Sequence, residues 1–173
     1  MKKVAKVILV LLIVTTGVNS VVGQDKPTNN EYPKVIGYIS VVHPIITFDK
    51  NGNTLNFDGG YTLGFPAGIN ILKNEKFGYS LEVVPFINAS NGNDKVNNVL
   101  FHPGLLFRYP KNWTLYTRMA FETSGRYGVT PSISKIVYKA KNTNLFVSMP
   151  VPLRFGNQKP ASIGVALQMG LTF

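Results

Sequence analysis

The sequence predicts an all-β protein, an eight-stranded antiparallel up-and-down transmembrane β-barrel with a packed polar lumen. Three observations lead to this fold class. Apolar residues alternate with small or polar ones over most of the chain, the pattern of strands with two unlike faces. The composition combines 16 Gly, 11 Pro and 11 Phe with only 15% charged residues, which favours strands and turns over helices. Short and long connections join the alternating segments in turn, as expected of a membrane barrel.

Residues 1–23 have the features of a secretory signal peptide. Lysines at positions 2, 3 and 6 precede an apolar run over 7–14, and Val21-Val22-Gly23 offers a small-residue cleavage site. The apolar run is shorter than a membrane-spanning helix requires. We therefore expect a signal peptide over 1–23, a polar N-terminal tail over 24–33 and the barrel over 34–173.

The composition excludes several classes of protein. The chain has no Cys, so neither a disulfide scaffold nor a Cys-based metal site is expected. Its formal net charge of +10 is reduced by the three lysines of the signal peptide, and the remaining excess suits anionic lipid headgroups. Nucleic acid is not an expected partner, because an exported protein rarely meets it. No later apolar stretch has the length of a spanning helix, so a membrane crossing requires a closed barrel.

Eight segments have the length and alternation of barrel strands. They lie at 35–46, 61–72, 77–87, 98–109, 113–122, 129–140, 145–155 and 161–173. Short connections lie at 73–76, 110–112 and 141–144, and longer ones rich in Asn, Gly or Asp lie at 47–60, 88–97 and 123–128. The connection at 156–160 is short where a long one is expected. An even strand count places both ends of the barrel on one side of the membrane.

The first and sixth segments are the least regular. Residues 35–43 are apolar on both faces, and the alternation does not determine where Lys135 points. The sixth segment is either a strand or an extension of the preceding loop, which would spoil the even count. The other six segments place their apolar residues at odd numbers and every charged residue at an even number. A hairpin keeps this parity only with an odd number of turn residues, so three-residue turns are predicted at Lys73–Glu75 and Pro110–Asn112.

The odd-numbered apolar face is predicted to point outward to lipid. The even face mixes glycines with charges, which suits a narrow, crowded lumen better than a soluble exterior. Aromatic residues of the odd face gather beside the short turns, where an interfacial girdle is expected: Phe77, Tyr79, Phe107, Tyr109, Trp113 and the terminal Phe173. The alternative is an exported soluble lipocalin-like barrel whose apolar face surrounds an apolar ligand.

The inward charges are predicted to form an ion-pair network in the lumen, since charges removed from bulk water need partners. Arg118 is expected opposite Gly104 across the 110–112 turn, and Glu82 opposite His102 or Gly104, so that Glu82 and Arg118 face one another. The full predicted network comprises Glu82, Arg108, Arg118, Glu122 and Arg154, with His102 and Gln168 as further polar groups of the lumen. A gated ion path is the functional alternative.

No residue pattern indicates a catalytic or metal site. His43 and His102 each precede a proline, and neither belongs to a known ligand or nucleophile motif. We expect no cofactor, no metal and no enzymatic activity. A lipid-active barrel enzyme with His and Ser near its outer rim is a further alternative. Ser124-Gly-Arg-Tyr-Gly128 reads as an exposed loop tip, either a recognition element or a plain turn.

The last segment carries a resemblance. Ala161–Phe173 alternates up to a terminal Phe, and this ending resembles the C-terminal recognition signal of bacterial outer-membrane β-barrels. With the signal peptide and the alternating segments, the chain resembles small outer-membrane barrels of Gram-negative bacteria, of OmpA-like and OmpX-like size, and its Asn-rich and Phe-rich loops resemble those of Bacteroidetes proteins. The resemblance implies an outer-membrane location, contact with its lipids, recognition of Ala161–Phe173 by the barrel-assembly machinery, and a structural, accessory or surface-interaction role with an unidentified envelope partner.

Overall fold

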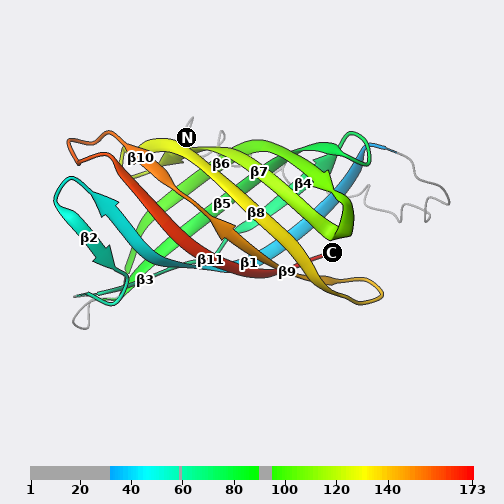
Figure 1. Ribbon diagram of the computed structural model, residues 1–173, viewed down its shortest axis with the longest axis horizontal. Helices are drawn as coiled ribbons and strands as arrows, with labels where there is room; N and C mark the ends of the chain where they lie inside the picture. Colours follow the sequence, from blue (N-terminus) through cyan, green and yellow to red (C-terminus); the bar gives the residue numbers. More distant parts are fainter. Residues whose placement is uncertain (1–31, 59, 90–94) are drawn as a thin grey trace, which may run out of the picture. The chain divides into compact units, whose positions relative to one another are not determined.

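The computed structural model describes residues 32–58, 60–89 and 95–173. The predicted signal peptide and most of the predicted tail lie outside the described residues. The described strands run obliquely around a closed antiparallel sheet (Figure 1). They are β1 Lys34–Asp49, β2 Gly52–Leu55, β3 Tyr61–Gly64, β4 Ala67–Leu72, β5 Phe77–Ala89, β6 Lys95–Tyr109, β7 Trp113–Glu122, β8 Tyr127–Lys139, β9 Asn144–Pro150, β10 Leu153–Phe155 and β11 Ser162–Thr172.

Eight ring-bonded strands make the barrel, which confirms the predicted strand count. Two of the eight are interrupted, because β3 and β4 together form one barrel strand and β9 and β10 form another. Each interruption contains a proline, Pro66 or Pro152, which has no backbone N–H to donate to a sheet. The carbonyls of these prolines still accept bonds from Ser40 N at 2.9 Å and Gly164 N at 2.8 Å. The short strand β2 lies outside the ring and pairs with β1.

The ring closes where β1 pairs with β11, from Tyr38 opposite Thr172 to Asp49 opposite Ser162. Beyond this ladder, Phe173 and Gly37 exchange two backbone hydrogen bonds of 2.9 and 3.0 Å. The terminal residue is therefore part of the closing seam. The uncertain sixth segment is a full strand, β8, so the strand number stays even.

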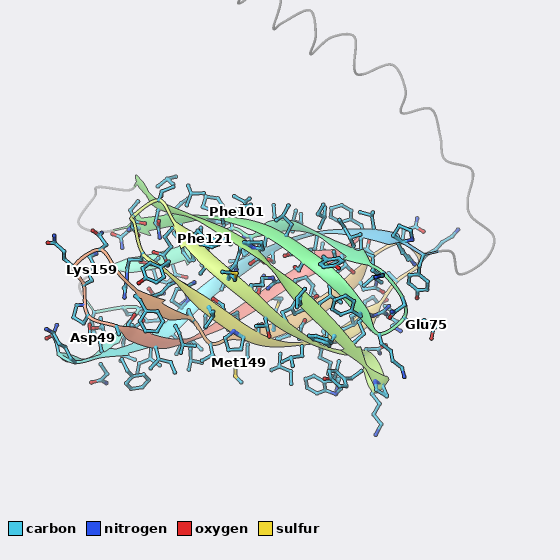
Figure 2. The ribbon with its side chains drawn as sticks, turned by 90° about the horizontal axis from the view of Figure 1, so that it is seen from above. Asp49, Glu75, Phe101, Phe121, Met149 and Lys159 are labelled. Atoms are coloured by element: carbon cyan, nitrogen blue, oxygen red, sulfur yellow. The ribbon has the colours of Figure 1, made fainter. Side chains whose placement is uncertain are left out.

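The two ends of the barrel differ. We call one the turn end: it holds the connections 73–76, 110–112 and 140–143, the start of β1 and the end of β11. The other is the loop end, with the connections 123–126 and 156–161 and the described part of the segment 50–60. Glu75 marks the turn end in Figure 2, and Asp49 and Lys159 mark the loop end.

One of the two predicted three-residue turns is displaced. Tyr109 pairs with Trp113, so the turn over 110–112 has three residues. At the other site Lys73 N donates to Phe77 O at 2.9 Å, which puts the turn at 74–76 and makes the predicted bounds of 73–75 wrong by one residue. The reason is Asn74, whose Oδ1 accepts bonds from Lys76 N and Phe77 N, both at 2.9 Å, and thus opens the turn as an Asx turn. The number of turn residues is odd in both cases, so the parity is kept.

The odd-numbered apolar side chains point outward. Phe101, Phe121 and Met149 project away from the barrel in Figure 2, and Leu115 and Met119 are likewise exposed. This finding confirms the predicted outward apolar face and contradicts the lipocalin-like alternative, which would bury these side chains around the lumen.

Three β-bulges reverse the parity locally. Register shifts occur between Pro44 and Ile46, between Phe86 and Ile87, and between Ile136 and Tyr138. Each bulge inserts one extra residue, so beyond it even-numbered residues point outward. The exposed even-numbered large apolar residues are Phe48, Val96 and Tyr138. All three lie beyond a bulge.

The inward face has an apolar and a polar part. Val42, Val84, Leu100, Ala120 and Ala166 form a buried cluster against which Phe86 packs. Polar and charged side chains occupy most of the other buried inward positions, among them five serines, Thr130, Glu82, Arg118 and Arg154. Among the residues that the structure describes, no helix is long and apolar enough to cross a membrane.

Candidate functional site

A belt of polar side chains crosses the middle of the lumen. We define this central belt as Tyr38, Ser40, Ser80, Glu82, His102, Arg118 and Gln168. All seven are buried and come from even positions on β1, β5, β6, β7 and β11. An even residue of a barrel strand points to the lumen here, so alternation alone brings these side chains inside.

Glu82 is the acceptor at the centre of the belt and is 3% exposed. Its carboxylate accepts hydrogen bonds from Tyr38 Oη at 2.9 Å, His102 Nδ1 at 2.9 Å and Gln168 Nε2 at 3.3 Å. Arg118 Nη1 lies 3.8 Å from Glu82 Oε1. A carboxylate this deeply buried needs such partners, since desolvation of an unpaired charge is costly.

Arg118 extends the belt across the lumen. Its Nε donates to Ser80 Oγ at 3.1 Å and its Nη2 donates to Tyr38 Oη at 3.2 Å. The guanidinium carbon lies 4.1 Å from the centre of the Tyr116 ring, a cation–π contact. These bonds join β7 to β1 and β5, which are not its neighbours in the sheet.

Glycines make room for the belt. Arg118 pairs with Gly104 as predicted, and a Cβ at position 104 would collide with Thr117 O and with Arg118 Cα on β7. Gly68 plays the same part beside Tyr38, where an added Cβ would lie 2.6 Å from Cζ of the tyrosine ring. Any side chain at these two positions would displace the belt residue beside it.

A second ion pair lies nearer the loop end. Arg154 Nε donates to Glu122 Oε1 at 2.6 Å, and Arg154 Nη1 donates to Thr130 Oγ1 at 2.9 Å. The other carboxylate oxygen, Glu122 Oε2, accepts from Asn98 Nδ2 at 2.8 Å and Ser124 Oγ at 2.9 Å. This loop-end pair has its own partners and does not touch the central belt by any described hydrogen bond.

The structure therefore places the five predicted network residues in three groups instead of one. Glu82 and Arg118 meet in the belt, and Glu122 and Arg154 form the loop-end pair. Arg108 is exposed, belongs to neither, and makes no ion pair with the described carboxylates. Its position explains this: Arg108 is four residues from Gly104 along β6, about 13 Å nearer the turn end at 3.3 Å per residue.

Several lumen residues were not predicted, among them Ser80 of the belt. Tyr38 and Ser40 lie in the first segment, which is apolar on both faces, so the sequence did not show which of its residues point inward. Arg126 was assigned to an exposed loop tip, but its Nη2 donates to Pro160 O at 2.9 Å, Ser162 Oγ at 3.1 Å and Arg154 O at 3.2 Å. The even residue number of Arg126 could have indicated that its side chain points inward. Glu122 and Arg126 pair across a three-residue turn, which keeps the same parity on both strands of the hairpin.

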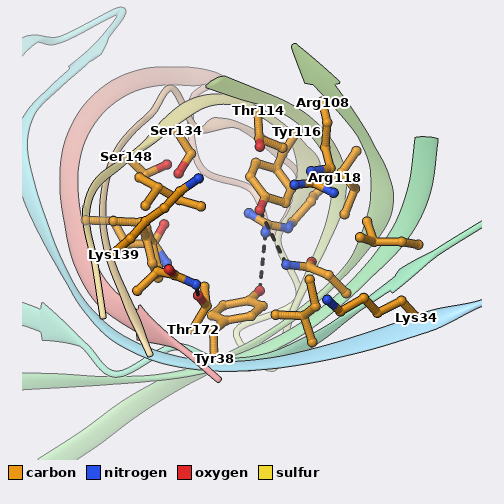
Figure 3. A pocket seen from close by; sticks show the side chains of 18 residues that line it. Lys34, Tyr38, Arg108, Thr114, Tyr116, Arg118, Ser134, Lys139, Ser148 and Thr172 are labelled. Carbon is orange, nitrogen blue, oxygen red and sulfur yellow. Dashed lines mark hydrogen bonds between the residues drawn. The ribbon is translucent and has the colours of Figure 1, made fainter. Parts of the chain in front are cut away.

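Two cavities lie in the lumen, and Arg118 and Gln168 of the belt line both of them. The turn-end cavity has a volume of about 250 Å³ and is bordered by Lys34, Arg108 and Lys139 (Figure 3). The loop-end cavity has a volume of about 190 Å³ and a more apolar wall. Within the described ranges no three His, Asp or Glu side chains are grouped so that they could hold a metal ion.

The two histidines lie in different surroundings. His102 is in the belt, whereas His43 is part of an aromatic cluster at the loop end with Phe57 and Tyr61, at ring distances of 5.5 and 5.3 Å. His43 Nδ1 also lies 2.9 Å from Asn56 Nδ2. The two rings share no described partner, so they do not make a common site.

The predicted aromatic residues lie on the outer surface near the turn end. Tyr79, Phe107, Tyr109, Trp113 and Phe173 are exposed, and Phe77 packs half-buried at 5.4 Å from both the Tyr79 and the Phe107 rings. Lys135 also points outward, with its Nζ 4.8 Å from the centre of the Trp113 ring.

A second aromatic row near the loop end was not predicted. Phe101 pairs with Phe121, Phe121 with Tyr127, and Tyr127 with Phe155, so four exposed rings follow one another across β6, β7, β8 and β10. The odd parity of all four residues was a signal for this row. The register that aligns them becomes visible only in the folded sheet.

Comparisons with known proteins identify the fold. No protein-family model matches the chain, and no curated protein matches it significantly. The crystal structure of Ail, the attachment invasion locus protein of Yersinia pestis, is similar with a TM-score of 0.51 and 10% identity over 82% of this chain and 99% of that chain. The de novo designed TMB2.3 is similar with a TM-score of 0.50 and 10% identity over 82% of this chain and 93% of that chain. The chain thus has the fold of small outer-membrane β-barrels.

Proposed function

We propose that the protein is an integral, non-enzymatic protein of the outer membrane of a Gram-negative bacterium, with a structural, accessory or surface-interaction role. The observation that carries this proposal is the continuous band of outward apolar side chains around a lumen that is crossed by a belt of polar residues. Exposed apolar surface of this extent is unfavourable in water and favourable in lipid.

The two aromatic rows support a membrane position. Tyr109 of the turn-end row and Phe101 of the loop-end row are eight residues apart on β6, which is about 26 Å along the strand at 3.3 Å per residue. A strand tilt of 35–45° shortens this to about 20 Å along the barrel axis. That height suits an apolar band flanked by aromatic girdles in the outer membrane, which is thinner than most bilayers.

The charge distribution supports an orientation with the turn end in the periplasm. Glu75 is the only acidic side chain in the turn-end segments 73–76, 108–112 and 134–141. The cations of the same segments and of the start of β1 are Lys34, Lys73, Lys76, Arg108, Lys111, Lys135, Lys139 and Lys141. Such a ring of cations is attracted to anionic phospholipid headgroups. Short periplasmic turns are also the rule for barrels of this type.

The last strand is the proposed contact for the barrel-assembly machinery. β11 forms the closing seam with β1, and the Phe173 ring lies over Gly37, where an added Cβ would be 2.6 Å from Phe173 Cε2. A terminal strand with outward apolar residues is what an assembly factor can pair with before the barrel closes.

The side-chain geometry favours a non-enzymatic role. In the lipid-active alternative a serine of the outer rim needs a histidine as its base. Ser124 Oγ instead donates to Glu122 Oε2 at 2.9 Å, while His102 bonds Glu82 in the belt. The serine and the histidine thus have separate carboxylate partners.

Cell fractionation and gel mobility test the location. We expect the protein in the outer-membrane fraction, with a different mobility in boiled and unboiled samples because the closed barrel resists detergent. Extraction by mild salt, or identical mobility in both samples, would contradict the proposal.

Lipid analysis tests the non-enzymatic role. We expect the acyl-chain composition of the host lipids to be the same with the wild-type chain and with the His102→Ala and Ser124→Ala variants. A difference that depends on either side chain would favour the enzymatic alternative.

A further inference from the structure

The loop-end cavity has the features of a binding site for a small molecule. Its floor is the belt, with Glu82, His102, Arg118 and Gln168, and its rim holds Arg126 and the loop-end pair. The wall between them is apolar and is formed by Val42, Pro44, Pro66, Val84, Phe86, Leu100, Pro150, Pro152 and Ala166. The volume of about 190 Å³ is far larger than a single water molecule requires.

His102 lines this floor and has one unused hydrogen-bonding atom. Its Nδ1 lies 2.9 Å from Glu82 Oε1, and because a carboxylate can only accept, Nδ1 carries the hydrogen of that bond. In the neutral ring the other nitrogen, Nε2, then presents a lone pair. Nε2 is buried and has no partner among the described residues, in a side chain that is 4% exposed. A buried acceptor of this kind needs a donor, which a hydroxyl group supplies.

Arg126 presents the complementary group at the rim. Its Nη2 is bonded to two carbonyls and to Ser162 Oγ, but its Nε is buried and has no partner among the described residues. No described carboxylate lies within ion-pair distance of Arg126, and Glu122, its neighbour across the hairpin, pairs with Arg154. The rim thus carries a partly buried cation that lacks a counter-charge, which an anionic ligand group supplies.

We propose that the loop-end cavity binds a short hydroxycarboxylic acid with an apolar body. The carboxylate contacts Arg126, the apolar body lies between the valine, leucine and proline side chains, and the hydroxyl group donates to His102 Nε2. Glu122, the neighbour of Arg126 across the hairpin, pairs with Leu100, two residues from His102 on β6. Arg126 and His102 are therefore about 7 Å apart along the strands and about 10 Å apart across them, which is two strand spacings, and a flexible chain of about six carbons is chosen to reach from one side chain to the other.

Methyl NMR on the full mature chain, folded in detergent micelles, tests this site. The probes are 6-hydroxyhexanoate, hexanoate and 1-hexanol, and the readouts are the methyl signals of Val84, Leu100 and Ala166. We expect saturable shifts of these signals, with the tightest binding for 6-hydroxyhexanoate and a roughly tenfold weaker affinity for each probe that lacks one polar group. The outward methyls of Leu115 and Val129 should not follow the same curve, since they report partition into the micelle.

A matched pair of variants tests the role of the rim cation. Arg126→Gln should weaken binding of 6-hydroxyhexanoate roughly tenfold and leave 1-hexanol unchanged. Lys159→Gln removes an exposed cation of the loop end outside the cavity wall and should change neither affinity. Heat-modifiable mobility establishes that each variant is folded. If Arg126→Gln does not fold, the three-probe series on the wild-type chain decides whether the cavity recognises the carboxylate and the hydroxyl group.

Three results would overturn the proposal. The first is the absence of saturable shifts at the cavity methyls, which would mean that the cavity holds only water. The second is an equal affinity for all three probes, which would mean that neither Arg126 nor His102 recognises the ligand. The third is an equal loss of affinity in Arg126→Gln and Lys159→Gln, which would mean that the affinity depends on the total charge of the loop end and not on Arg126.

Discussion

At the scale of residues, Glu82 organises the lumen because it is the one carboxylate of the central belt. It receives bonds from Tyr38 on β1, His102 on β6 and Gln168 on β11, and it faces Arg118 on β7. A single side chain thus links four strands other than its own. Removal of its charge leaves Arg118, 4% exposed, without a counter-ion.

Glu82→Gln is expected to lower the free energy of unfolding by about 3 kcal/mol, because it leaves Arg118 buried and unpaired. Urea unfolding in micelles measures this change. Glu75→Gln at the turn end is the matched control and should change the free energy by less than about 0.5 kcal/mol, since Glu75 is exposed.

The double variant Glu82→Leu with Arg118→Met separates charge from packing. Because it removes both charges together, it should be more stable than Glu82→Gln alone. If the Glu82→Gln variant were as stable as the Glu75→Gln variant, the belt would not depend on this ion pair.

At the scale of elements, glycines and bulges determine which side chains fit inside the barrel. β6 and β7 approach each other closely at Gly104, where Arg118 lies across the empty position. The bulge in β8 lets Val137 and Tyr138 both point outward and brings Lys139 to the wall of the turn-end cavity. Local backbone irregularities therefore set the composition of both lumen ends.

Gly104→Ala is expected to destabilise the barrel by about 1–3 kcal/mol, since the added Cβ collides with the backbone of β7 and must move Arg118. The control is Gly164→Ala, another inward position, where the nearest atom to the added Cβ is Ile46 O at 3.2 Å. The difference between the two unfolding free energies is the measurement. Equal effects would mean that contact between β6 and β7 at Gly104 is not tight.

At the scale of the whole molecule, the belt closes the lumen between two cavities. Eight strands enclose an interior that side chains can just fill. The arrangement of Glu82, Arg118 and Gln168 is consistent with this size, and it argues against the gated ion path considered from the sequence. The outer surface, in contrast, is apolar around the barrel and cationic at the turn end, which suits a protein held in lipid.

The wild-type barrel is expected to show no stepwise ion conductance in planar lipid bilayers, because the belt interrupts the lumen. The double variant Glu82→Ala with Arg118→Ala joins the two cavities and should conduct. Lys111→Ala at the turn end is the control and should stay closed. Stepwise currents through the wild-type chain would restore the ion-path hypothesis.

Much of the fold was predictable because alternation is a local property of an extended backbone. The parity of Phe101, Leu115 and Met119 identified one apolar face without any knowledge of the neighbouring strands, and the glycines and charges of the opposite face indicated that the apolar face points outward. The meeting of Arg118 with Gly104 followed from a three-residue turn, which fixes the register nearby. The burial of Arg126 was missed, because a side chain next to a glycine-bounded turn resembles an exposed loop residue.

The sequence by itself determined that the strands have two unlike faces and that one of these faces is polar, and it predicted eight strands with the apolar face outward, since alternation and turns are short-range properties. Only the tertiary structure decided which inward groups meet. Glu82 and Gln168 come together because β1 pairs with β11 and closes the ring. Arg108 on β6 and Arg118 on β7 stay apart because they lie at different heights along the barrel. Contacts across a lumen depend on closure, register and bulges together, and these are properties of the whole sheet.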